Sequence, residues 1–255
     1  MKAGTIEEAA RRVTTALERV FFSLDQVAGA FEDLARDVRS RDAPLRATEL
    51  GRLEPAICRQ LDALPAIHGA GVVTAEGLLA DQQRFLEWWR RGPTTFERFF
   101  LNVDPAVDGF YDYVDMEWYR GPHVEGRRVV AGPYIDYRCA DVYVLTFTRP
   151  VLFEGAFLGI AGADVPLALF ESELVPALRR LIPDAVLVNR ERRVVAASRA
   201  RWTIGAKLKA MPAPGEDWLA VEPVTGDLGW VLAVARREAD ELASAGGGPG
   251  SRRSR

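Results

Sequence analysis

The stretch FYDYVDMEWYRGP, from Phe110 to Pro122, opens the part of the chain that decides the fold. GPYIDYR (132–138), VLTFTRPV (144–151) and GIAGADVP (159–166) follow it. All six tyrosines of the chain lie between Tyr111 and Tyr143, together with one tryptophan and four aspartates. Tyrosine and tryptophan combine a flat apolar ring with a polar tip. Such rings beside carboxylates and a glycine-rich strand favour a small, polar, cationic ligand in an aromatic pocket, although a tyrosine-rich surface hairpin or core would show the same composition.

The composition bounds the class of protein. The chain has 255 residues, of which 48% are hydrophobic, and its formal net charge is −3. This is enough for one sizeable core, and no global positive field attracts nucleic acid. The two histidines, His68 and His123, exclude a histidine-rich metal site, and the two cysteines, Cys58 and Cys139, form no CxxC pair. We therefore expect no cofactor, no metal and no nucleic-acid partner.

The N-terminus and the hydropathy pattern bear on location. Residues 1–12, MKAGTIEEAARR, contain acidic side chains and lack the apolar region of a secretory signal. No window approaches the ~18 uninterrupted apolar residues that a membrane span requires. We therefore expect a soluble, cytoplasmic protein that does not contact a membrane, which the low number of cysteines also favours.

A long amphipathic helix is predicted from Thr5 to about Ser40. Thr5 and Glu8 have the spacing of a capping box. Apolar residues then recur at intervals of mostly three or four: Ile6, Val13, Leu17, Val20, Leu24, Val27, Phe31, Leu34 and Val38. A helix of roughly 35 residues extends about 50 Å, longer than a domain of this size is wide. We therefore expect part of the apolar stripe to meet a second copy of the chain, so that the helix forms a homodimer.

The remaining elements indicate an α+β fold. The expected elements are a helix over 48–64, strands over 67–75, 84–90 and 96–103, a short segment over 110–120, strands over 142–152 and 153–164, a helix over 166–181, and strands over 185–188, 194–197, 218–221 and 229–235. Pro55 marks a break in the first of these helices, Gly121-Pro122 ends the short segment, and Glu154-Gly155 is the turn between the paired strands. This order predicts an antiparallel sheet with helices at one side.

Two features of the sequence are relevant to a ligand pocket. Trp88 and Trp89 point to opposite faces if they lie on a strand, so at most one faces a pocket. We expect the tryptophans other than Trp118 in the core: Trp88, Trp89, Trp202, Trp218 and Trp230. Gly159 and Gly162 leave the second strand of the hairpin with little bulk. A ligand would approach such a strand closely, and a bulge or crowded packing would explain the same glycines.

The order of these motifs resembles the Cache family of PAS-like sensor domains. The matching residues are Trp118-Tyr119, GPYID (132–136), TFTRPV (146–151), GIAGAD (159–164) and VVAAS (194–198), and the resemblance covers roughly residues 50–235. It implies a long N-terminal helix packed on a PAS-like antiparallel sheet with flanking helices. It also implies division of the chain into the helix (1–45), a Cache-like ligand-binding domain (46–238) and a flexible C-terminal tail (239–255).

The resemblance implies a ligand-binding site, with one departure. In the amino-acid-sensing branch of the family, an arginine two residues before the Trp-Tyr pair holds the ligand carboxylate, and Met116 stands there in this chain. Tyr111 and Asp164 match the positions that hold the rest of the ligand. The pocket implied consists of Tyr111, Trp118, Tyr119, Tyr134, Asp136, Thr146 and Asp164. Without a guanidinium this pocket suits an amine or a quaternary ammonium better than an α-amino acid, unless Arg120, Arg138 or Arg149 supplies an anion partner.

The predicted function is a sensor that binds a small amine or amino-acid-like ligand and signals or regulates transcription through a protein partner. Asp164 could instead cap the helix that begins near Pro166. Two alternatives stay open. One is a hydrolase that uses Asp112, Asp115 and Glu117 as acid and base. The other is a scaffold in which the long helix mediates interactions.

Overall fold

The N-terminal helix α1 (Ile6–Ser40) begins and ends as the sequence predicts. The hydroxyl oxygen of Thr5 accepts a hydrogen bond from the backbone N–H of Glu8 at 3.2 Å, which caps the first turn. The structure, a computed structural model, describes residues 5–136, 142–181, 184–215 and 217–236. It forms two compact units, one from Thr15 to Phe170 and one that combines the chain before Thr15 with the chain from Glu171 onward. Helix α1 therefore contributes residues to both units.

The apolar stripe of α1 is buried within the chain. From Val13 to Val38 its members are no more than 5% exposed. Phe21, beside the stripe, packs edge-on against Phe147 of the sheet, with 5.4 Å between ring centroids. The reason for expecting a second copy against this stripe is therefore wrong, because the chain itself covers it. The homodimer stays a prediction.

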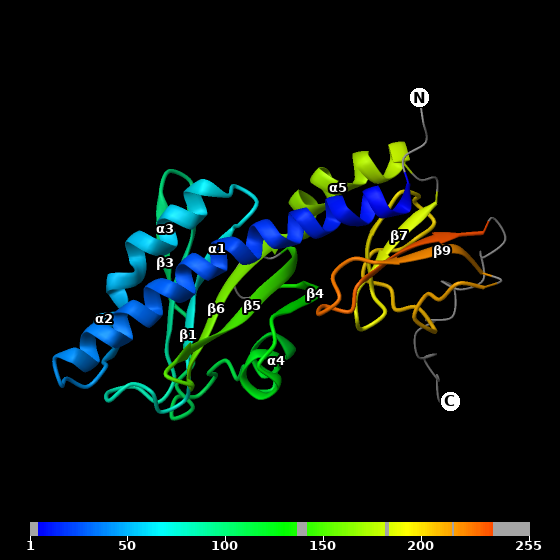
Figure 1. Cartoon of the computed structure of the whole chain (residues 1–255). Coiled ribbons are helices and arrows are strands. Elements are labelled where there is room, and N and C mark those ends of the chain that lie inside the picture. The colour runs from blue at the N-terminus through cyan, green and yellow to red at the C-terminus, as the bar shows by residue number, and fades with distance from the viewer. Residues whose placement is uncertain (1–4, 137–141, 182–183, 216, 237–255) are drawn as a thin grey trace, which may run out of the picture. The chain divides into compact units, whose positions relative to one another are not determined.

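An antiparallel sheet of six strands forms the body of the unit from Thr15 to Phe170, in the order β3-β2-β1-β6-β5-β4 (Figure 1). Its strands are β1 (Gly69–Thr74), β2 (Leu86–Arg91), β3 (Phe96–Phe99), β4 (Val129–Ile135), β5 (Tyr143–Phe153) and β6 (Ala156–Pro166). The helices of this unit, besides its share of α1, are α2 (Ala47–Leu50), the 3-10 turn η1 (Gly51–Leu53), α3 (Glu54–Ala63) and α4 (Glu117–Glu125). The α+β fold predicted from the sequence is confirmed.

Helix α4 differs from the expectation, because Gly121-Pro122 lies inside it rather than ending the segment. Proline has no N–H to donate to the carbonyl four residues earlier. That carbonyl belongs to Trp118, and it accepts a hydrogen bond from the hydroxyl of Thr148 in β5 at 2.6 Å. The strand thus supplies the donor that Pro122 lacks, and the helix continues to Glu125.

The β5–β6 hairpin turns at Glu154-Gly155, as predicted. Both residues have positive φ, 50° and 81°, which suits the tight turns that join twisted antiparallel strands. Gly159 is explained by crowded packing rather than by a ligand. A Cβ atom there would lie 2.1 Å from the carbonyl oxygen of Val73 in β1, and its φ is 139°.

The second unit contains a sheet of its own. Strands β7 (Ala185–Val188), β8 (Val194–Ala197), β9 (Trp218–Pro223) and β10 (Val231–Ala235) pair in the order β8-β7-β10-β9. Trp202 stacks on Trp218 in its core, with 5.7 Å between centroids. Helix α5 (Leu167–Leu181) joins the two sheets along the chain. The expectation of a single sheet is therefore wrong, since the last four strands form a separate one.

The two units differ from the predicted division into 1–45, 46–238 and 239–255, which stays a prediction about independent domains. The predicted tail lies outside the described residues. In the part of the chain that the structure describes, none of the helices combines the length and the apolar character needed to cross a lipid bilayer.

Candidate functional site

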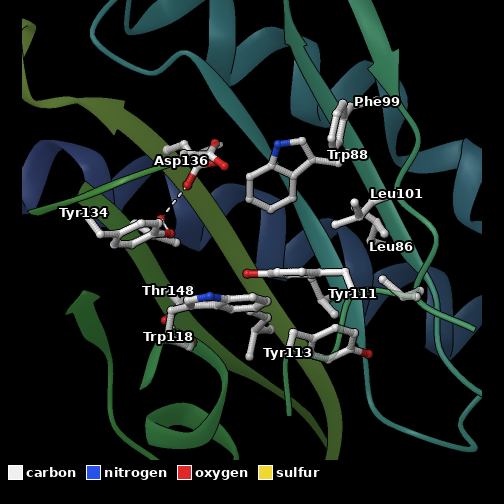
Figure 2. Close-up of a pocket in the computed structure, with 15 residues that line it drawn as sticks. Leu86, Trp88, Phe99, Leu101, Tyr111, Tyr113, Trp118, Tyr134, Asp136 and Thr148 are labelled. Carbon is white, nitrogen blue, oxygen red and sulfur yellow. Dashed lines mark hydrogen bonds between the residues drawn. The ribbon is translucent and has the colours of Figure 1, made fainter. Parts of the chain in front are cut away.

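A cavity of about 80 Å³ lies on one face of the six-stranded sheet. By the same measure one water needs ~10–15 Å³, so the cavity has room for several waters or a small organic molecule. Figure 2 shows side chains from the strands and from the 101–118 segment surrounding it. The cavity is lined by Val73, Leu86, Trp88, Phe99, Leu101, Val103, Tyr111, Tyr113, Trp118, Tyr134, Asp136, Thr146, Thr148, Ile160 and Asp164.

Six of the seven residues predicted for the site line this one cavity: Tyr111, Trp118, Tyr134, Asp136, Thr146 and Asp164. Tyr119 does not. Consecutive residues of a helix point about 100° apart, so α4 turns Trp118 toward the cavity and Tyr119 into the core behind it. Tyr119 is 2% exposed and packs edge-on against Tyr113, with 4.9 Å between centroids. Whether the six residues bind a ligand stays a prediction.

The polar end of the cavity is a chain of hydrogen bonds across three strands. Thr146 of β5 and Asp164 of β6 lie directly opposite each other in the sheet. The Thr146 hydroxyl donates to Oδ1 of Asp164 at 2.6 Å and lies 2.5 Å from the hydroxyl of Tyr134. Because the Thr146 hydrogen is used toward Asp164, the Tyr134 hydroxyl is the donor in the second bond. One of the two carboxyl oxygens of Asp164 thus accepts a hydrogen bond from a donor that is held in place.

Asp164 is the buried acid of the site. Its residue is 9% exposed, and burial raises the pKa of its carboxyl to about 7. The hydrogen bond from Thr146 opposes this rise in pKa, while the nearby negative charge of Asp136 adds to it. The alternative role as a helix cap is not what the structure shows. Asp164 lies within β6, which continues to Pro166, and its carboxylate bonds to Thr146.

A β-bulge in β4 places Tyr134 on the cavity face. Ala131 pairs with Thr146 and Tyr134 pairs with Val144, so β4 has one more residue than β5 over this interval. Side chains alternate between the faces of a regular strand, so Tyr134, three residues after Ala131, shares the face of Ala131 only because of the bulge. Gly132 lies in the bulge with φ 111°, a backbone region that favours glycine. Burial, and then the charge of Asp164, raise the pKa of Tyr134, so its hydroxyl stays protonated as a donor.

Aromatic rings form the other walls. In Figure 2 the ring of Tyr111 lies between Trp88 and Trp118, and its hydroxyl points into the cavity. Tyr113 supports this wall by stacking on Trp118, with 5.6 Å between centroids and 26° between ring planes. The walls therefore offer flat apolar faces, and the hydroxyl of Tyr111 is a polar group among them.

Trp88 is buried, as expected, with 7% of its surface exposed, and it also lines the cavity. Its neighbour Trp89 points to the opposite face, where its indole N–H donates to Oε1 of the buried Glu87 at 2.9 Å. The alternation of a strand correctly assigned the pair to opposite faces. It could not say which face carries the cavity, because that depends on strands β5 and β6, about 60 residues away in the sequence. Tyr113 and Thr148 were also missed.

No described residue that lines the cavity carries a positive charge. Met116 is 41% exposed and does not line it. Among the candidate arginines, Arg120 is exposed, Arg149 forms an ion pair with Asp25, and Arg138 lies outside the described residues. The ionisable acids that line the cavity are Asp136 and Asp164.

The acids proposed for the hydrolase alternative do not meet in this cavity. Asp112 forms an ion pair with Arg84, with 3.0 Å between Oδ1 and Nη1. Asp115 is exposed, and Glu117 begins α4; neither of them lines the cavity. Within the described ranges, no group of three or more histidine, cysteine, aspartate or glutamate side chains is placed to hold a metal ion.

Comparison with known proteins gives the class. Residues 66–171 match the family model described as methyl-accepting chemotaxis protein-like, first PDC sensor domain. The chain matches no curated protein. Residues 66–171, which hold all of the cavity-lining residues, are thus a PDC sensor domain, and the Cache-type resemblance is confirmed for this segment. Sensor domains of this class bind ligands rather than transform them.

Solved structures share the fold over nearly the whole chain. The extracellular domain of mmHK1S-Z3 is 15% identical with a TM-score of 0.61, covering 91% of this chain and 93% of that one. The ligand-binding domain of the Pseudomonas fluorescens chemoreceptor CtaA, in complex with L-alanine, is 16% identical with a TM-score of 0.60, covering 92% and 95%. That of the Pseudomonas aeruginosa PAO1 amino-acid chemoreceptor PctC, in complex with GABA, is 19% identical with a TM-score of 0.55, covering 89% and 95%.

Proposed function

We propose that the cavity binds a small amine or amino-acid-like compound and that the protein acts as its sensor. The observation that carries the proposal is the charge of the lining: rings and two carboxylates, with no cation among the described lining residues. The ammonium group would lie at Asp164 and Asp136. The apolar body of the ligand would lie against the rings of Trp88, Tyr111 and Trp118.

The expected affinity follows from these groups. A hydrogen bond between an ammonium and a buried carboxylate contributes roughly 1.5–3 kcal/mol, and an aromatic face contributes about 0.5–2 kcal/mol to holding a cation. Two carboxylates and two rings together approach the ~8 kcal/mol of a micromolar dissociation constant if the cavity is preorganised. The hydrogen bonds of Thr146 and Tyr134 fix the acid before the ligand arrives, which favours such preorganisation.

An amine is preferred over an α-amino acid because a ligand carboxylate would enter the cavity without a cationic partner among the described lining residues. The ligands named for the CtaA and PctC structures, L-alanine and GABA, both carry an amino group. They support the ammonium half of the proposal. Binding of the ligand carboxylate would depend on the arginine that the resemblance places two residues before the Trp-Tyr pair, and this chain has Met116 at that position.

A sensor also needs a route for its signal. Binding has to favour one arrangement of the protein over another, and a partner protein has to read the difference. The predicted partners are a second copy of the chain, through α1, and a regulatory protein, and both remain proposals. The cytoplasmic location expected from the sequence also stays a prediction; the mmHK1S-Z3 domain is extracellular by its name.

The test is a thermal-shift and calorimetric screen of the purified protein against alkylamines, α-amino acids and small carboxylates, repeated with Asp164→Asn. We expect amines to raise the melting temperature, and the substitution to weaken amine binding by about tenfold or more because it removes a charge-assisted bond. Asp33→Asn is the matched control, since Asp33 is an exposed residue of α1 whose side chain is 74% exposed. Binding of carboxylates but not amines, or an Asp164→Asn protein that binds amines normally, would overturn the proposal.

A further inference from the structure

Trp88 lies across three glycines of the neighbouring strands. A Cβ atom at Gly69 would lie 2.8 Å from the indole Nε1, one at Gly71 would lie 2.9 Å from Cε3, and one at Gly162 would lie 3.2 Å from Cζ3 and Cη2. Gly69 and Gly71 belong to β1 and Gly162 to β6. Gly71 is directly opposite both Trp88 and Gly162, so the indole extends from its own strand β2 over β1 to β6.

The same indole forms a wall of the cavity. Trp88 lines the cavity together with Tyr111 and Trp118, and Figure 2 shows Tyr111 between the two tryptophans. Because the indole rests on glycine backbone, no intervening side chain separates it from the sheet. Its distance from the sheet, and hence the space left in front of it, depends on the absence of Cβ atoms at these three positions.

The position of Trp88 relative to the acid follows from the register. Gly162 and Asp164 are two residues apart on β6, so they share one face and are separated by about 7 Å at ~3.3 Å per residue. An ammonium group at Asp164 would therefore place the first carbon atoms of the ligand beside the ring that covers Gly162. The indole is the apolar surface that the body of the ligand would meet first.

We propose that Trp88, held on Gly69, Gly71 and Gly162, is the specificity-determining residue that sets the length of the apolar body the cavity accepts. This inference rests on the proposed amine function and adds a size limit to it. The residue would act by excluded volume, so its effect on affinity depends on ligand length. A residue that only supported the fold would change the affinity for all ligands alike.

Two substitutions move the wall in opposite directions. Gly162→Ala adds a methyl group 3.2 Å from the indole, so the ring has to move by a few tenths of an ångström toward the cavity. Trp88→Ala removes the wall and enlarges the cavity. Gly29→Ala is the matched control for the added methyl group, because a Cβ atom at Gly29 on α1 has no atom within 4 Å. Trp89→Phe is the control for a changed tryptophan on the opposite face.

The experiment measures dissociation constants of linear primary alkylamines with two to eight carbons for the full chain and for each variant. In the wild type, affinity should rise by roughly fourfold for each added carbon until the apolar space is filled, and then fall. Gly162→Ala should move the maximum to a shorter amine. It should weaken the amine that binds tightest to the wild type by about tenfold or more, while ethylamine changes by less than about twofold. Trp88→Ala should move the maximum to a longer amine.

The outcomes separate the two proposals. A maximum that stays at the same length in both Gly162→Ala and Trp88→Ala would overturn the role of Trp88 and leave the amine proposal standing. If Trp88→Ala does not fold, the shift in Gly162→Ala decides the question alone. If the wild type binds small carboxylates but no amines, the proposed function fails, and the same comparison is made with a carboxylate series. A wild type that binds neither series would overturn both proposals.

Discussion

At the scale of the residue, the ionisation of Asp164 makes the proposed ligand binding depend on pH. Its carboxyl is buried beside Thr146, Tyr134 and Asp136, and its pKa is raised to about 7 mainly by burial. The neutral acid is therefore favoured in the folded, empty protein below pH 7, whereas an ammonium ligand needs the carboxylate. A raised pKa in the folded state means that protonation stabilises the fold, so the contribution of Asp164 to stability falls as pH rises from about 4 to about 7.

We expect amine affinity to decrease as pH falls below 7. With a pKa near 7, about one molecule in a hundred carries an ionised Asp164 at pH 5, so apparent affinity at pH 5 should be roughly a hundredfold weaker than at pH 8. Calorimetry in two buffers with different ionisation enthalpies would also detect the proton released on binding at pH 6. An affinity that does not vary between pH 5 and pH 8 would contradict this assignment. Asp164→Asn should show weak binding that no longer varies in this way.

At the scale of the element, α4 depends on a strand for one of its hydrogen bonds. The carbonyl of Trp118 lacks the usual helical donor four residues on, since residue 122 is proline, and the Thr148 hydroxyl donates to it instead. Thr148 is fully buried and also lines the cavity. The same bond therefore stabilises the helix and fixes the main chain that carries the Trp118 ring.

Thr148→Val should reduce the free energy of unfolding by about 1–3 kcal/mol, because it leaves a carbonyl without a partner. The effect should be smaller in a Pro122→Ala background, where the N–H of residue 122 is able to donate to Trp118 within the helix. Chemical denaturation of the four proteins in this double-mutant cycle measures the coupling. Equal effects of Thr148→Val in both backgrounds would show that the threonine stabilises the fold for another reason.

The elements also show what local sequence signals reveal. The N-cap at Thr5, the period of α1 and the turn at Glu154-Gly155 are local signals, and the structure contains each feature at the expected residues. The bulge in β4, the donor from Thr148 and the face of Trp88 were not predicted. Each depends on how a strand pairs with a distant one, which the residues around it do not encode.

The site shows the same limit. The resemblance to Cache domains named six residues that line the cavity, because motif spacing preserves which residues a family places there. It also included Tyr119, because a pair of adjacent aromatic residues does not show which of the two side chains a helix turns toward the cavity. The apolar wall, including Trp88 and Phe99, comes from the β2–β3 hairpin, which none of the quoted motifs contains.

At the scale of the whole molecule, α1 is an internal element whose apolar stripe the chain covers. Leu24 lies in that stripe and is fully buried, whereas Phe22 on the same helix is 64% exposed. If the stripe packs within one chain, its contribution to stability should not depend on protein concentration. If it packed between two chains, stability would rise with concentration.

Leu24→Ala should reduce the free energy of unfolding by about 2–5 kcal/mol at every protein concentration, because it leaves a cavity in the core. Phe22→Ala should change it by less than about 0.5 kcal/mol. Thermal unfolding over a hundredfold range of concentration, with the mass measured by light scattering, provides the comparison. A melting temperature that rises with concentration in the wild type but not in Phe22→Ala would instead assign Phe22 to an interface between copies.

The bulge of β4 makes the chemistry of the cavity depend on whether a count of residues is odd or even. Tyr134 follows Ala131 by three residues, an odd number that a regular strand would turn to the opposite face. If the two intervening residues paired regularly with β5, Tyr134 would leave the hydrogen-bond chain, and Thr146 would lose its donor. Natural variants that keep both intervening residues should therefore also keep the bulge.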